Sequence, residues 1–272
     1  MTRVEEDGGV RIRFVRHATF VLYVGGISVL VDPMLNLAGA VDPVPETPNQ
    51  RRNPLVGLPF DEGELGRLLE RVDAVLVTHT HQDHWDARAV ESIPEDTPII
   101  CQPEDEASIA GAGFSTVFPV ASELWWRNVH FTRTGGRHGT GEIGRKMGPV
   151  SGFVVRAAGT PSTYVAGDTI WCPEVEEALS KHEPAVTVVN AGAAQFLTGG
   201  PITMTAEDVG NVCCALPSTR VVAVHMEALN HCLLTQYELH ESLRREGISA
   251  RVEIPPDGAL IEDPTRSLED SC

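Results

Sequence analysis

The stretch Thr78-His79-Thr80-His81-Gln82-Asp83-His84 places three histidines and one aspartate within six positions. Imidazole and carboxylate groups are the ligands that zinc, manganese and iron take in proteins. His79 and His81 lie two residues apart just after an apolar run, so both side chains can point the same way from an extended loop. A solvated polar turn is the alternative, but the position between an apolar run and a helical pattern favours a metal site.

Further candidate ligands lie elsewhere in the chain. Asp168 and His225 each come directly after an apolar run, and His138 lies in a glycine-rich stretch, residues 135–141. Taken alone, an aspartate after glycine is more often a turn residue, and a histidine after a strand is more often a structural hydrogen-bonding group. Because ligands gather at the carboxyl ends of strands in α/β sheets, we expect these side chains to meet the histidine-rich loop in a two-metal site.

The elements that must position these residues follow from the hydrophobic pattern. Continuous apolar runs fit strands that are buried on both faces, and they occur at residues 73–78, 162–167, 185–189 and 220–224. Helical patterns occupy residues 65–71, 87–92, 173–181, 206–216 and 235–246. Asp86 is suited to cap the second of these helices. Sheets with helices on their outer faces are therefore predicted, which is an α/β fold.

The first third of the chain has a different pattern. Residues 10–15 predict a strand, and residues 20–24 and 27–31 predict a hairpin across Gly25-Gly26. Residues 36–59 contain five prolines, which exclude a helix or a central strand there. Loops of this length are often functional, and whether this one forms a lid stays open.

The composition excludes several classes of protein. The 272 residues carry 21 Lys and Arg against 38 Asp and Glu, a net charge of −17, which disfavours nucleic acids and anionic membranes as partners. The N-terminus lacks the apolar core of a signal peptide, no run is long enough to span a membrane, and six scattered cysteines suit reduced thiols. We therefore expect a cytoplasmic protein that acts on a small molecule; a homo-oligomer is left open.

The motifs together resemble a known family. The order His79-x-His81-x-Asp83-His84, then His138, Asp168 and His225, resembles the metallo-β-lactamase superfamily. Residues 15–19, the Gly-Gly hairpin and Asp32-Pro33 are similar to the branch that contains L-ascorbate-6-phosphate lactonase and the phospholipase D that hydrolyses N-acylphosphatidylethanolamine. The resemblance extends over residues 10–261. It departs at Arg16, where the branch usually has glycine.

The resemblance implies an α/β fold in the form of a four-layer αββα sandwich, with two similar βα halves and metals at one edge between the sheets. We expect residues 1–262 to form this single domain and residues 263–272 to form a loose tail. It also implies two divalent metal ions, with zinc favoured and manganese or iron as alternatives. The first ion would be held by His79, His81 and His138, the second by Asp83, His84 and His225, and Asp168 would bridge them.

The same resemblance implies how the site would work. A hydroxide shared by the metals would attack a carbonyl or phosphorus, since two Lewis acids lower the pKa of bound water toward roughly 7. Asp83 and Asp168 are the catalytic candidates, and Asp83 would orient water or protonate the leaving group.

Substrate-binding candidates are His17, His231, Arg137 and Arg145. The two histidines line the pocket in one interpretation and make structural hydrogen bonds in the other. Five basic residues lie around His138 within an acidic chain, either as a solvated face or as a guide for an anionic substrate: Arg127, Arg133, Arg137, Arg145 and Lys146.

Several classes of function are compatible with these residues. We predict a metal-dependent hydrolase of a small anionic lactone, ester or phosphodiester. The alternatives are a di-iron redox enzyme on the same fold, since histidine and carboxylate also suit non-haem iron, and a phosphodiesterase of a lipid-like substrate. A non-catalytic relative is disfavoured because all seven candidate ligands are present. The −17 charge disfavours a nuclease.

Overall fold

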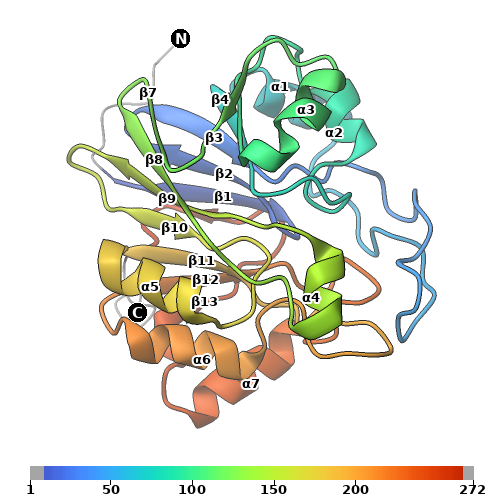
Figure 1. Ribbon diagram of the computed structural model, residues 1–272, viewed down its shortest axis with the longest axis vertical. Helices are drawn as coiled ribbons and strands as arrows, with labels where there is room; N and C mark the ends of the chain where they lie inside the picture. The colour runs from blue at the N-terminus through green and yellow to red at the C-terminus, as the bar shows by residue number, and fades with distance from the viewer. Residues whose placement is uncertain (1–8, 266–272) are drawn as a thin grey trace.

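The computed structural model describes residues 9–265, in which two sheets lie face to face between two groups of helices (Figure 1). The first sheet has the order β14-β1-β2-β3-β4-β5-β6. Its strands are β1 (Arg11–Arg16), β2 (Thr19–Val24), β3 (Ile27–Val31), β4 (Ala74–Val77), β5 (Ile99–Cys101), β6 (Val117–Pro119) and β14 (Leu260–Ile261).

The second sheet has the order β13-β12-β11-β10-β9-β8-β7. Its strands are β7 (Glu123–Trp126), β8 (Val129–Thr134), β9 (Gly152–Ala157), β10 (Thr163–Val165), β11 (Val186–Asn190), β12 (Arg220–Val224) and β13 (Val252–Glu253). The helices are α1 (Glu62–Leu69), α2 (Ala87–Ser92), α3 (Glu106–Gly111), α4 (Gly141–Met147), α5 (Pro173–His182), α6 (Ala206–Ala215) and α7 (Gln236–Arg245), with short 3₁₀ turns at Pro103–Asp105 and Ser249–Arg251.

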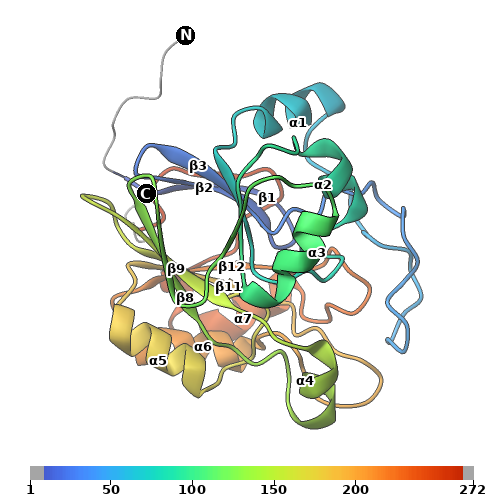
Figure 2. The same ribbon diagram turned by 45° about the horizontal axis from the view of Figure 1, so that its top comes forward.

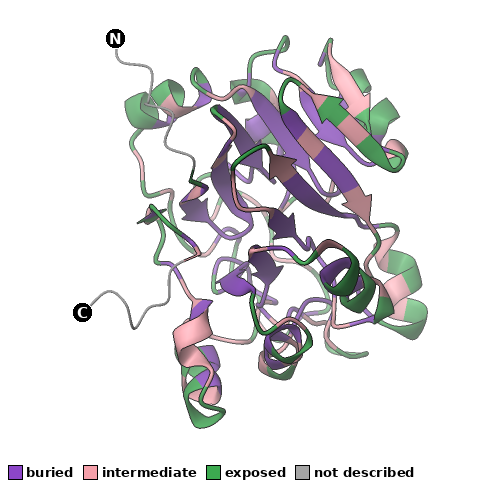
Figure 3. Ribbon diagram, turned by 90° about the vertical axis from the view of Figure 1, so that its left-hand side faces the viewer, coloured by how far each residue is buried: buried purple, intermediate pink, exposed green. Residues whose placement is uncertain are grey.

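Three hydrophobic layers hold these elements together. Leu22 of β2 and Phe131 of β8 belong to the layer between the sheets. Leu65 of α1 packs in a second layer over the outer face of the first sheet, and Leu239 of α7 packs in a third over the second sheet. Most strand residues are accordingly buried, while the helices turn exposed faces outward (Figure 3). The predicted four-layer αββα sandwich is confirmed.

The local predictions agree with the observed elements. Gly25 and Gly26 join β2 to β3 with φ angles of 57° and 76°, a region that glycine enters at little cost. Four predicted helices appear as α2, α5, α6 and α7, and the predicted helix at residues 65–71 appears as α1, which begins three residues earlier. Asp86 caps α2 by accepting a hydrogen bond from the backbone N–H of Ala89. Local signals therefore sufficed for these elements.

The proline-rich segment, residues 36–59, forms no helix and no sheet strand, as predicted. Its one regular feature is an isolated antiparallel bridge between Val41 and Asn53. In Figure 1 and Figure 2 the segment runs along the side of the molecule on which α4 lies. Its backbone also bonds to the segment after β12, because Leu55 donates to the carbonyl of Ala228 at 2.7 Å.

Arg16 anchors both ends of this segment. It is fully buried, and its guanidinium donates to the carbonyls of Met34 at 2.8 Å, Asn36 at 3.0 Å and Val56 at 2.9 Å. Burial lowers the pKa of Arg16 to about 10, so the group stays charged at neutral pH. The residue that departs from the expected glycine thus fastens the proline-rich segment to the end of β1.

Asn230 anchors the middle of the segment. Its buried side chain accepts from the backbone N–H of Val44 at 3.1 Å and donates to Thr47 Oγ1 at 2.6 Å and to the carbonyl of Asn49 at 2.8 Å. Asn53 Nδ2 donates to Asn230 Oδ1 at 2.8 Å. The segment is therefore docked on the chain that follows β12, close to His225 and His231.

The remaining sequence predictions concern composition. The part of the chain that the structure describes has no helix long and apolar enough to cross a membrane. Five cysteines, at positions 101, 172, 213, 214 and 232, are free thiols as predicted. Cys272 lies outside the described residues, as does most of the predicted tail, residues 263–272.

Candidate metal centre

The first predicted ligand triad comes together beyond the ends of β4 and β8. Each of His79, His81 and His138 offers one ring nitrogen, and these nitrogens lie within 4.8 Å of one another. His79 Nε2 is 2.9 Å from His81 Nδ1. His79 and His138 are buried, whereas His81 is half-buried. The three nitrogens can therefore face one ion from the protein side.

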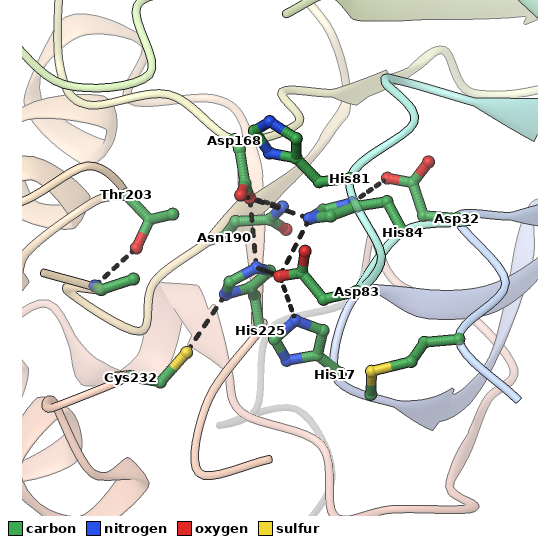
Figure 4. A network of polar contacts seen from close by, with 12 residues as sticks. His17, Asp32, His81, Asp83, His84, Asp168, Asn190, Thr203, His225 and Cys232 are labelled. Carbon is green, nitrogen blue, oxygen red and sulfur yellow. Dashed lines mark hydrogen bonds and ion pairs between the residues drawn. The ribbon is translucent and has the colours of Figure 1, made fainter. Parts of the chain in front are cut away.

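The second predicted triad lies beside the first. Asp83 Oδ2 is 3.7 Å from His84 Nε2 and 3.4 Å from His225 Nε2 (Figure 4). His17 joins this group, because its Nε2 lies 3.2 Å from Asp83 Oδ2 and its ring packs on that of His225 with centroids 3.7 Å apart. The structure thus places His17 against the second triad, fully buried, as a partner of Asp83 or a further ligand.

The carboxylate of Asp168 lies between the two triads. Its Oδ1 is 3.3 Å from His225 Nε2, and its Oδ2 is 3.2 Å from His84 Nε2. The same Oδ2 is 3.4 Å from His138 Nε2 and 3.9 Å from His79 Nε2. One carboxylate therefore reaches nitrogens of both triads, which is the placement of a bridging ligand.

The residues fit a pair of metal ions. His84 Nε2 and His225 Nε2 are buried and lack a hydrogen bond of good geometry, although both lie within 3.3 Å of Asp168. Buried polar atoms of this kind are rare unless something else satisfies them. Five imidazoles and two carboxylates form a donor set that suits zinc, manganese or iron.

The electrostatics of the cluster are consistent with bound cations. Burial raises the pKa of Asp168, but His225, His84 and His138 outweigh it and hold the pKa well below its usual range. Burial lowers the pKa of His84, yet Asp168, Asp83 and Asp32 raise it to about 10. His84, His17 and His225 likewise outweigh burial and hold the pKa of Asp83 well below its usual range, so both carboxylates are ionised and favour cations beside them.

A surrounding set of hydrogen bonds orients the ligands. Asp32 accepts from His84 Nδ1 at 2.9 Å and, through its two oxygens, from the backbone N–H and the hydroxyl of Thr78, each at 2.8 Å. The hydroxyl of Thr78 also lies 3.1 Å from His79 Nδ1. Such partners fix the orientation of metal-binding histidines. No role was predicted for Asp32 from the sequence, although it directly follows β3, and Asp168 comes three residues after the end of β10.

Two more contacts complete this set. His138 Nδ1 donates to the carbonyl of Ile202 at 2.8 Å, and Asn190 Nδ2 donates to Asp168 Oδ1 at 2.6 Å. Asn190 is the last residue of β11, so the strand-end pattern marks it too. The partner of His138 comes from a distant loop, and no local signal marks it.

The backbone near the cluster is strained. His17, Asp32 and His225 have φ angles of 59°, 43° and 64°, although none is glycine. Such conformations cost of order 1–3 kcal/mol each and concentrate at functional sites. Before Asp168, glycine is required, because a Cβ on Gly167 would lie 2.7 Å from the carbonyl oxygen of Ser151.

The other predicted substrate residues lie in different settings. His231 is 6% exposed, its Nδ1 has no hydrogen-bond partner, and its ring centroid is 6.1 Å from that of Phe196. Burial lowers its pKa to about 4, so it is neutral at neutral pH. Arg137 is half-exposed and pairs with Glu174 at 2.9 Å, and Arg145 is exposed on α4. Neither arginine belongs to the histidine cluster.

Three more basic residues of the predicted stretch are also paired. Arg133 Nη2 lies 2.9 Å from Glu104 and Lys146 Nζ lies 3.2 Å from Glu142. Arg127 pairs with Asp73 at 2.5 Å. Carboxylates therefore neutralise most of this stretch, as in a solvated face.

Comparison with known proteins identifies the family. Residues 29–226 match the model of the beta-lactamase superfamily domain, which is most of the chain. The chain therefore belongs to the metallo-β-lactamase superfamily, as the motifs predicted.

Individual relatives are similar over nearly the whole chain. The UPF0173 protein YddR of Bacillus subtilis is 36% identical over 92% of this chain and 98% of its own length. A crystal structure described as a possible metal-dependent hydrolase from Veillonella parvula has a TM-score of 0.89 and 32% identity, covering 93% of this chain and 98% of its own. The isothiocyanate hydrolase from Delia radicum gut bacteria has a TM-score of 0.86 and 35% identity, covering 92% and 98%.

These findings confirm the predicted class, a metal-dependent hydrolase of this superfamily. The finer assignment to the lactonase and phospholipase branch stays a prediction.

Proposed function

We propose that this protein uses two divalent metal ions, with zinc favoured, to hydrolyse a small, neutral electrophile, and that the substrate class is the isothiocyanates. The observation that carries the proposal is the position of Asp168 between two ligand triads, within 3.2–3.9 Å of four imidazole nitrogens. A site built to hold two cations around one carboxylate suits activation of water.

In the proposed reaction, the metal ions and the side chains of the protein have different roles. Bound metals supply Lewis acidity, which polarises the substrate and lowers the pKa of water. Asp83 is the ligand carboxylate with access to solvent, since its side chain is 17% exposed and that of Asp168 is 3% exposed. Asp83 therefore orients the attacking water, receives its proton and passes it to the leaving nitrogen, while Asp168 holds the two halves of the site together. His231, neutral and close to the cluster, provides a hydrogen bond to the substrate.

The substrate class rests on a relative and on the surroundings of the site. The isothiocyanate hydrolase covers nearly the whole chain at 35% identity. Isothiocyanates are uncharged and carry an apolar group. Four exposed apolar side chains lie within two residues of groups that contact Arg16, His231 or His225: Leu37 at 57%, Val56 at 37%, Leu197 at 67% and Leu233 at 37% exposure. These side chains favour an apolar substrate.

The predicted preference for an anionic lactone, ester or phosphodiester receives less support. It depended on Arg137 and Arg145, and Arg137 is already engaged with Glu174. Arg145 is exposed on α4, next in the chain to Lys146, which pairs with Glu142. A neutral substrate is therefore the better match, and Arg145 keeps anionic substrates as the alternative to be tested. The cytoplasmic location stays part of the proposal.

The test is product analysis with the purified protein. Hydrolysis of R–N=C=S by one water gives the amine R–NH2 and carbonyl sulfide, so both products should appear in equal amounts. Matched neutral and carboxylated isothiocyanates, lactones and esters serve as the panel. If neither product is released and a lactone or ester is hydrolysed instead, the isothiocyanate assignment is wrong, whereas the assignment as a hydrolase stands.

Elemental analysis decides between hydrolysis and the redox alternative. We expect about two metal ions per chain, and chelation should abolish turnover. If the protein contains two iron ions, absorbs visible light and converts a substrate in an oxygen-dependent reaction, it is a redox enzyme and the proposed hydrolase function is wrong.

A further inference from the structure

Cys232 lies beside Nδ1 of His225, and among the described residues no carboxylate or hydroxyl hydrogen-bonds to that nitrogen. Its Sγ is 3.6 Å from His225 Nδ1 (Figure 4). We propose that Cys232 is a positioning residue that accepts the Nδ1–H of His225, and that thiol modification at this position releases metal from the second triad. The proposal rests on the proposed metal-dependent function, and it concerns this thiol rather than the ligands themselves.

The tautomer of His225 supports the assignment. Its Nε2 faces Asp83 and Asp168 at 3.4 Å and 3.3 Å, so this nitrogen is the one available to a metal. A neutral imidazole carries one hydrogen, which must then lie on Nδ1 and needs an acceptor. Among the other ligands, His84, His79 and His138 have Asp32, Thr78 and a carbonyl in this role. Cys232 fills the same place for His225.

The local backbone makes room for the sulfur. A Cβ on Gly192 would lie 2.2 Å from the carbonyl oxygen of His225 and 3.1 Å from Cys232 Sγ, so glycine is required there. The backbone N–H of Cys232 donates to the carbonyl of Leu229 at 3.2 Å, which holds the residue in its turn. The thiol is thus fixed against the imidazole by the segment that follows β12.

A thiol differs chemically from the other orienting groups. Carboxylate, hydroxyl and carbonyl groups resist electrophiles, whereas sulfur adds to them. Cys232 is half-buried, while Cys101, Cys172 and Cys213 are buried. An isothiocyanate adds so that an S–C bond forms, the C=N π bond breaks and the thiol proton moves to nitrogen, which gives a dithiocarbamate. The added group would occupy the space between Gly192 and His225 and turn the imidazole away.

Two substitutions separate orientation from packing. Cys232→Val keeps the volume and removes the acceptor, whereas Cys232→Ser loses volume and keeps an acceptor. Affinity for the more weakly held zinc ion is measured by chelator competition on the holoprotein. We expect a loss of about 10- to 100-fold for valine and a smaller loss for serine. The matched control Cys214→Val, at an exposed thiol on α6, should bind zinc as the native chain does.

Equal zinc affinity in Cys232→Val and in the native chain would contradict the proposal. A weaker zinc affinity in Cys232→Ser than in Cys232→Val would also contradict it, because loss of packing volume alone would produce that order. A second readout is independent of metal. In ¹H–¹⁵N spectra of the metal-free protein, the Nδ1–H signal of His225 should persist in the native chain and in the serine variant, and broaden by water exchange in the valine variant. If the native chain binds no metal, the proposed function fails, and this signal still decides the role of Cys232.

Chemical modification tests the second half of the proposal. N-ethylmaleimide should release about one equivalent of zinc from the native holoprotein and from Cys214→Ser, but not from Cys232→Ser. Equal zinc loss from Cys232→Ser would refute the link between this thiol and the second triad. Replacing the maleimide by an excess of an isothiocyanate should give the same pattern, with the mass of one adduct on Cys232.

Discussion

Asp32 joins two strands of the first sheet to His84, a proposed metal ligand, so Asp32→Asn tests how the centre is held. Its carboxylate is buried at 1% exposure and accepts three hydrogen bonds, two from Thr78 and one from His84. The amide of asparagine has the same shape but only one acceptor oxygen. At least one of the three donors would therefore face an N–H group.

The magnitude follows from these contacts. A hydrogen bond to a charged group contributes about 1.5–3 kcal/mol, and removing one partner of a buried charged pair costs about 3–5 kcal/mol. We expect the free energy of unfolding of the metal-free protein to fall by about 3 kcal/mol. Because His84 loses its orienting partner, metal affinity at the second triad should fall about 10- to 100-fold, or about 1.4–2.7 kcal/mol.

The assay combines urea unfolding of the metal-free protein with chelator competition for zinc. Asp73→Asn is the matched control, because Asp73 accepts from the backbone N–H and hydroxyl of Ser28 at 2.9 Å and 3.0 Å at the opposite end of β3 and β4. This control should lose stability and keep its zinc affinity. Native zinc affinity in Asp32→Asn would falsify the assignment of Asp32 as the group that orients His84.

Three further predictions concern the ligands, the docked segment and the charge of the substrate. His81→Ala should abolish turnover and leave a protein that is folded by circular dichroism, because His81 lies on a loop beyond a strand. His231→Ala should lower turnover by only about 10- to 100-fold, and equal inactivity of both variants at saturating zinc would contradict this order. Asn230→Ala removes the side chain that holds residues 44–53, so limited proteolysis should cut within them much faster than in the native chain, and an unchanged cleavage rate would show that Arg16 alone suffices. Arg145→Ala should leave kcat/KM unchanged for neutral substrates and for matched carboxylated ones, whereas a rise in KM confined to the anions would restore the basic stretch as a binding site.

The sequence predicted Asp168 and His225 as candidate ligands because each follows an apolar run. Apolar runs bury both faces of a strand, so the end of each run marks where a polar side chain emerges. Asp168 and His225 were found this way, and all seven predicted ligands converge in the structure. Asp32 and Asn190 occupy the same kind of position, but no role in the site was predicted for either.

Other features had no local signal. The basic residues around His138 lie close in sequence, but the carboxylate that engages Arg137 is 37 positions away. Charge along the chain therefore indicated an anion site that the ion pairs of the folded protein do not favour. The role of His17 likewise depended on Asp83, 66 residues later.

The sequence by itself predicted seven strands, five helices and the chain order of the candidate ligands, since each depends on neighbouring residues and on which face is apolar, and the motifs indicated the family. Only the tertiary structure decided what surrounds the ligands. Asn230 meets Val44 across 186 residues, and Arg16 meets Val56 across 40. Contacts between residues so far apart in the chain form only when the packing of the two sheets brings their segments within hydrogen-bonding distance. Such contacts produce no periodic pattern in the sequence, so the sequence alone does not predict them.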